Sequence, residues 1–135
     1  MAVTVTPKIN DVAATLITST SVNATLEQDI TGGSCILHAV RLTASTADDV
    51  FFKIWNGDGS AVVVGTTAPD VILFAPGNDT VTYTFTDTAT TGGGIALTGM
   101  SIAAVHNSGV ADGPGTEGTT NPTGAFSLYA VTTPT

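Results

Sequence analysis

The strongest constraint in this sequence is a two-residue alternation of apolar and polar side chains, which recurs in short segments along the chain. In the clearest segment, Val81, Tyr83 and Phe85 alternate with threonines. Successive side chains of a β-strand point to opposite faces, whereas a helix repeats its apolar positions every three or four residues. No segment shows a helical repeat, and Gly, Pro and Asn separate the alternating segments. The sequence therefore predicts an all-β chain with almost no helix.

About eight short strands separated by turns are typical of one antiparallel β-sandwich, here jelly-roll-like and spanning residues 1–135. A hairpin is expected where the Asn56–Gly59 turn joins the strand at 50–55 to a continuation at 62–64. Residues 1–10 and the tail at 132–135 resemble flexible arms, and residues 110–124 a Gly/Pro-rich exposed loop. Strands are also predicted at 36–43, 71–74, 81–85, 95–97, 102–105 and 126–131, with one or two more within 16–26.

The charge balance excludes several partners. Three basic residues face eleven acidic ones, and the formal net charge is -8. Nucleic acids and anionic membrane surfaces are held mainly by Lys and Arg, so neither is an expected partner. The N-terminus has no basic segment followed by a long apolar one, which favours synthesis in the cytoplasm without a signal peptide.

No motif for catalysis, a cofactor or a metal stands out. Residues 113–118 match a dinucleotide-binding pattern, but prolines oppose the helix that this pattern requires. His38 and His106 have no carboxylate or second histidine at ligand spacing, and the loop around Asp58 departs from the EF-hand pattern. Cys35 is the single cysteine and is expected to be buried and inert. The prediction is a non-enzyme with no cofactor and no metal.

The scarcity of charge indicates a subunit that buries part of its surface against copies of itself. Only 10% of the residues are charged, while 42% are hydrophobic. Soluble monomers of this size usually carry more charge and avoid large apolar patches. A homotrimer or another cyclic oligomer would cover surplus apolar side chains and strand edges. The residues expected at the interface are Val3, Val5, Val62, Val63 and Val64.

The middle half of the chain resembles small virion structural proteins of tailed bacteriophages, including cyanophage-like viruses. The resemblance rests on a G-T-T-x-P-D segment before an apolar strand, a Pro-Gly turn and a V-T-Y-x-F strand, which occur here at 65–70, 76–77 and 81–85. Residues 39–42, 50–55 and 94–97 also match that pattern. The resemblance implies a jelly-roll-like virion subunit without enzymatic activity.

The expected function is therefore that of a capsid decoration (cement) protein, located on the virion and in contact with the major capsid protein or other virion proteins. A tail, neck or filament subunit is an alternative, because the same surface properties suit it. A second alternative is a receptor- or glycan-binding β-sandwich module, in which Trp55, Tyr83 or Tyr129 would stack on sugars. That alternative requires an exposed aromatic side chain beside polar groups.

Overall fold

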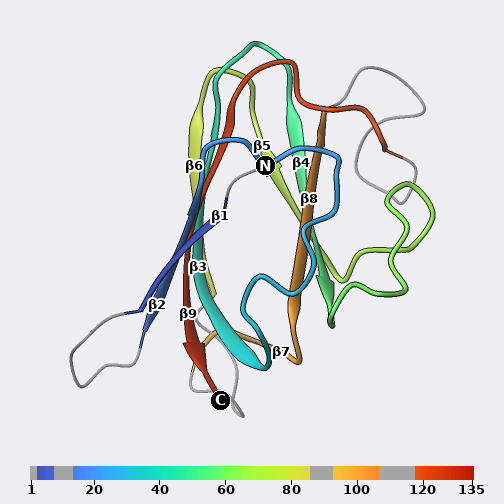
Figure 1. The fold of residues 1–135 in the computed structure, drawn as a ribbon. Coiled ribbons are helices and arrows are strands. Elements are labelled where there is room, and N and C mark those ends of the chain that lie inside the picture. Colours follow the sequence, from blue (N-terminus) through green and yellow to red (C-terminus); the bar gives the residue numbers. More distant parts are fainter. Residues whose placement is uncertain (1–2, 8–13, 86–92, 107–117) are drawn as a thin grey trace.

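The described residues, 3–7, 14–85, 93–106 and 118–135, form nine β-strands and no helix in the computed structural model. The strands lie in two antiparallel sheets that face each other (Figure 1). Sheet A contains, in order, β1 (Val3–Pro7), β2 (Thr15–Ser19), β9 (Phe126–Pro134), β3 (Cys35–Ala44) and β6 (Thr80–Thr84), with β7 (Ile95–Leu97) also paired to β3. Sheet B contains β5 (Val71–Ala75), β4 (Val50–Asn56) and β8 (Met100–His106). The predicted antiparallel β-sandwich is confirmed.

The strand order is that of a jelly roll, in which a long antiparallel hairpin wraps around itself to make two sheets. Such wrapping pairs the first strand with the eighth, the second with the seventh, the third with the sixth and the fourth with the fifth. Here the corresponding pairs are β2 with β9, Glu27 with β8, β3 with β6, and β4 with β5. The second strand is reduced to a bridge, in which Glu27 and Ile102 exchange two backbone hydrogen bonds of 2.9 Å. Strands β1 and β7 are additions to this plan.

The core lies between the sheets and is made by the inward half of each alternating pattern. One buried cluster joins the two sheets, and among its fully buried side chains are Val40 and Leu42 of β3 and Phe52 and Ile54 of β4. The rings of Phe52 and Phe126 lie 6.3 Å apart across this space. Burying a side chain of this size contributes about 1.5–3 kcal/mol, so the apolar half of the alternation is what holds the sheets together.

The loop after β4 differs from the predicted hairpin. Residues 62–64 lie in a loop and not in a strand, and β4 pairs instead with β5 across this loop at residues 57–70. Figure 1 shows this loop in green on the side of sheet B that faces away from sheet A. The apolar run of three valines was ambiguous, because a short run without alternation does not identify a strand.

The ends of the chain differ from the expected arms. Val3–Pro7 pairs with β2 as β1, and β9 continues through Thr132 to Pro134 beside β3. The Thr135 amide also donates to the Ser34 carbonyl at 3.4 Å. Backbone hydrogen bonds therefore anchor both segments. Residues 1–2 and 8–10 of the predicted N-terminal arm lie outside the described residues, as do residues 110–117 of the predicted Gly/Pro-rich loop.

Candidate interaction surfaces

The outer face of sheet B carries an apolar patch at its β5 edge. Ile72 and Phe74 alternate with the buried Leu73 and Ala75, so their side chains point away from the core, and each is 39% exposed. The Phe74 ring lies against Phe51 of the neighbouring strand, with the ring centroids 5.4 Å apart. We call Phe51, Ile72 and Phe74 the β5 patch.

The free edge of β5 is closed at its middle by a side chain from the other sheet. The Tyr83 hydroxyl of β6 donates to the Phe74 carbonyl at 2.6 Å and accepts from the Phe74 amide at 3.2 Å. These two backbone groups lie among those that a further strand would need for pairing. Contacts with a partner at the β5 patch are therefore expected through side chains and not through extension of sheet B.

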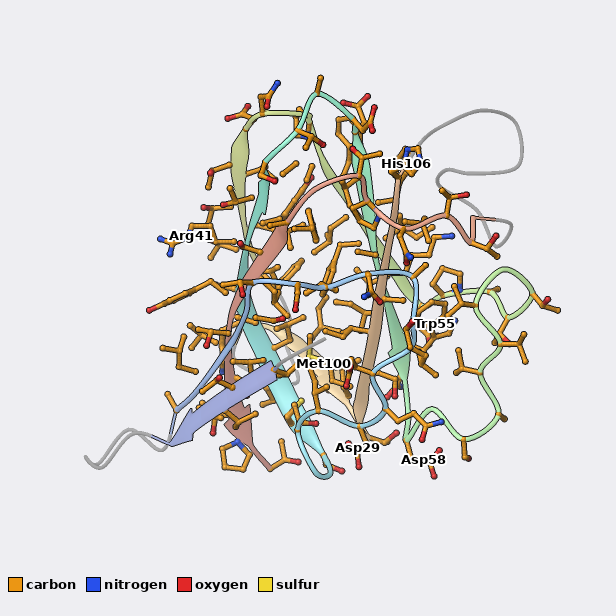
Figure 2. The ribbon with its side chains drawn as sticks, turned by 45° about the horizontal axis from the view of Figure 1, so that its top comes forward. Asp29, Arg41, Trp55, Asp58, Met100 and His106 are labelled. Atoms are coloured by element: carbon orange, nitrogen blue, oxygen red, sulfur yellow. The ribbon has the colours of Figure 1, made fainter. Side chains whose placement is uncertain are left out.

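The loop at 57–70 covers Trp55. The Trp55 indole N–H donates to the Thr67 carbonyl at 3.0 Å, and the side chain is only 3% exposed; Figure 2 shows it beside this loop. The loop is held at both ends. The Asn56 amide donates to Asp70 Oδ2 at 2.7 Å, and Ser101 Oγ donates to the Gly57 carbonyl at 3.0 Å. Trp55 is therefore unavailable as a platform for a sugar.

The predicted interface valines occupy two separate places. Val63 is 59% exposed in the 57–70 loop, whereas Val62 and Val64 on either side of it are half-buried. Val5 is exposed on the edge strand β1, and Val3 packs partly against the core. The role of these valines in an interface stays a prediction, and the closely packed part of the exposed apolar surface is the β5 patch.

The outer face of sheet A is lined with hydroxyl groups around one cation. The register places Thr82, Arg41, Tyr129, Thr18 and Thr4 opposite one another on five neighbouring strands. The Arg41 guanidinium lies over the Tyr129 ring, with its Cζ atom 4.4 Å from the ring centroid. Figure 2 shows the Arg41 side chain pointing away from the sandwich. The sequence placed Arg41 on the mixed face of its strand, but no sequence signal placed Tyr129 beside it.

Two shallow depressions flank this row. One, of about 170 Å³, is lined by Arg41, Tyr129, Thr43 and the β2 end of the sheet, including Thr18 and Thr20. The other, of about 310 Å³, is lined by Thr43, Thr80, Asn78 and Asp79. Thr43 belongs to both, and its hydroxyl lies 2.9 Å from that of Thr80. The two depressions therefore form one hydroxyl-lined track.

The titratable side chains in the described part of the chain form no group of three that could hold a metal ion. His38 Nε2 lies 2.9 Å from Thr133 Oγ1, and His106 Nδ1 lies 3.9 Å from Asp48 Oδ2. The amide and hydroxyl of Ser60 lower the pKa of Asp58, because both donate to its Oδ1. That carboxylate organises its own turn.

Cys35 is buried in β3, as predicted, and burial raises the pKa of its thiol above the usual value. A raised pKa keeps the sulfur protonated and unreactive at neutral pH.

Comparison with family models, with curated proteins and with solved structures finds no match to this chain. Among the described residues, no helix could cross a membrane. The interaction surfaces are therefore interpreted from their own chemistry.

Proposed function

We propose that this protein is a structural subunit of a virion, a capsid decoration (cement) protein that assembles with copies of itself and acts without catalysis. The β5 patch carries the proposal, because two large apolar side chains, Ile72 and Phe74, lie exposed on the same face of one strand. Jelly-roll sandwiches occur in viral capsid proteins, although also in lectins, so the fold supports the proposal without deciding it.

The proposed mechanism is mass action. A protein that binds the assembled shell and not its free subunits shifts the equilibrium toward the shell. A closed ring of copies would cover the β5 patch on each subunit, because cyclic symmetry repeats one contact until no surface is left open. The Tyr83 hydroxyl supports such closed assembly, since it blocks the open-ended strand addition that leads to fibres.

The test of self-association is the mass of the isolated chain, measured by size-exclusion chromatography with light scattering. We expect an oligomer that Phe74→Ser weakens by about ten- to a hundredfold in Kd, the effect of losing one large buried apolar side chain. Val5→Ser and Val63→Ser remove exposed apolar groups elsewhere, so they distinguish assembly through the β5 patch from assembly through the interface predicted at the valines. A chain that is monomeric at every concentration would contradict the proposed assembly.

Electron microscopy of the native particle tests where the subunit is located. Density for this sandwich on the outside of the capsid is the expected result. Density on a tail, neck or filament would replace the decoration role with one of those structural roles and leave the assembly argument intact.

A second candidate function is glycan binding on the outer face of sheet A. One observation favours it: Tyr129 is 39% exposed among hydroxyl groups, as a sugar-stacking aromatic must be. Trp55 is buried and the Tyr83 hydroxyl is engaged by Phe74, so Tyr129 is the aromatic platform that remains of the three predicted.

A further inference from the structure

The Arg41–Tyr129 pair has the geometry of a site for a carboxylate. The Arg41 guanidinium lies over the Tyr129 ring, with its Cζ atom 4.4 Å from the ring centroid, and the planar guanidinium group can donate two parallel hydrogen bonds to one carboxylate. The ring holds the cation by a cation–π contact and lowers the entropy lost on binding. Arg41 is exposed, and no carboxylate of the described residues lies within ion-pair distance of its guanidinium.

The rest of the chain makes this cation unusual. Arg41 is the only arginine in a sequence with eleven acidic residues and three basic ones. Of the two lysines, Lys53 is fully buried and Lys8 lies outside the described residues. Among the described residues Arg41 is the one exposed Lys or Arg side chain, and on a chain of net charge -8 one such cation cannot hold a polyanion, because each further phosphate or sulfate needs a positive partner of its own. It can hold one anionic group.

The surroundings of Arg41 fit the hydroxyl groups of a sugar. The depression beside it is lined by Thr18, Thr20 and Thr43 among other residues, and a threonine hydroxyl can both donate and accept hydrogen bonds. Its volume of about 170 Å³ is below the roughly 300–1,000 Å³ of pockets that enclose a small molecule, so it suits one terminal group of a larger ligand.

The neighbouring depression offers the opposite charge. Asp79 lines it together with Asn78 and Thr80, and Thr43 connects it to the Arg41 side. The Asp79 Oδ1 atom accepts from the Thr80 amide at 2.7 Å, while a carboxylate has further acceptor positions for ligand hydroxyls. The track thus presents a cation at one end, a carboxylate at the other and hydroxyls between them. A polyol with one carboxylate at its end matches this order.

We propose that the outer face of sheet A binds the acidic sugar residue of a glycan, with the sugar carboxylate on the Arg41 guanidinium and the sugar ring against the part of the Tyr129 side chain that Arg41 leaves exposed. This inference rests on the glycan-binding candidate and names its ligand class. It is independent of the β5 patch, which lies on the other sheet.

The experiment is an NMR titration that follows the Nε–H signal of the single arginine. The probes are the methyl glycosides of glucuronic acid and N-acetylneuraminic acid, with methyl glucoside as the neutral match and acetate and sulfate as simple anions. We expect the acidic sugars to shift the Arg41 signal and to bind at least about tenfold more tightly than the neutral sugar, because charged hydrogen bonds exceed neutral ones.

Two variants test the roles of the pair. Arg41→Gln should reduce acidic-sugar binding to the level of the neutral sugar, and Arg41→Lys should restore it only in part, because lysine lacks the planar fork. Thr84→Ala, on the same face of sheet A but outside both depressions, is the matched control and should bind like the wild type. The backbone amide spectrum of each variant reports whether the sandwich remains folded.

Three other outcomes would contradict the acidic-sugar inference, and they differ in what they imply for glycan binding. Equal binding of neutral and acidic sugars overturns the inference and leaves glycan binding in place. Binding of acetate or sulfate as tightly as the acidic sugars also overturns it, since the site would then be a simple anion site. If no saccharide shifts any signal of sheet A, both the inference and the glycan-binding candidate fail.

Discussion

Replacing Tyr83 by phenylalanine removes one oxygen atom and leaves the ring that packs partly against the core. The lost oxygen is the one that occupies both backbone groups of Phe74 at the edge of β5, at 2.6 and 3.2 Å. Tyr83→Phe therefore tests two consequences of one contact. It should lower the free energy of unfolding, and it should open a strand edge.

The size of the stability effect follows from the exposure of the edge. One intramolecular hydrogen bond contributes about 0.5–1.5 kcal/mol net, and a buried group left without a partner costs more. Water can reach the Phe74 backbone once the hydroxyl is gone, because the contact lies at an exposed edge. We therefore expect a loss of about 1 kcal/mol for the two bonds together, or a fall in Tm of about 3–5 °C.

The assays are urea unfolding and hydrogen exchange at the Phe74 amide. Exchange at Phe74 should rise about fivefold for 1 kcal/mol, whereas amides of β4 should change only with global stability. Tyr129→Phe is the matched control, because no hydrogen bond joins the Tyr129 hydroxyl to the described residues. The opened edge should also make Tyr83→Phe form larger species on storage. Equal stability and equal Phe74 exchange in the two variants would refute the edge-closing role of Tyr83.

Three further predictions concern packing and the thiol. Gly77→Ala should destabilise the fold by about 2–3 kcal/mol in urea unfolding, because a Cβ there would lie 2.1 Å from the Ala47 carbonyl oxygen. Gly32→Ala is the control: its Cβ would meet open space, and its φ of 67° should cost only about 1–2 kcal/mol. Phe52→Ala should lower the free energy of unfolding by about 3–5 kcal/mol, because the ring is fully buried, and Ile72→Ala should lower it by less than about 1 kcal/mol in the monomer, because that side chain is exposed. Similar values for both variants in urea unfolding would contradict the assignment of inner and outer faces. Cys35 should resist iodoacetamide in the folded protein and react fully in urea, and rapid labelling at neutral pH would be inconsistent with a buried thiol. Because burial raises the pKa of this thiol, its contribution to stability is intact below the ordinary thiol pKa and is lost as the pH rises through the pKa of the folded state.

Prediction from sequence worked where the information is local. The strands at Cys35–Ala44, Val50–Asn56 and Thr80–Thr84 match the predicted segments to within a few residues. Alternation needs no knowledge of the rest of the chain, because it reflects only the two faces that every strand has. It placed Val40 and Leu42 on the apolar face of their strand, but the register shift between Leu37 and Ala39 buries Leu37, which the alternation assigned to the mixed face, and leaves Ile36 half-buried. It failed at Val62–Val64, where no alternation exists.

The order of the strands is what tertiary structure decided, and the candidate sites depend on it. Alternation places Arg41, Tyr129 and Tyr83 on one face or the other of their own strands, but it says nothing about which strand lies next to which. The jelly-roll wrapping brings β9 beside β3 and so puts Tyr129 against Arg41. The same wrapping carries β6 over the edge of β5, where Tyr83 meets Phe74. Which side chains become neighbours depends on the path of the whole chain, because the packing that fixes each strand's position comes from strands that are distant in sequence.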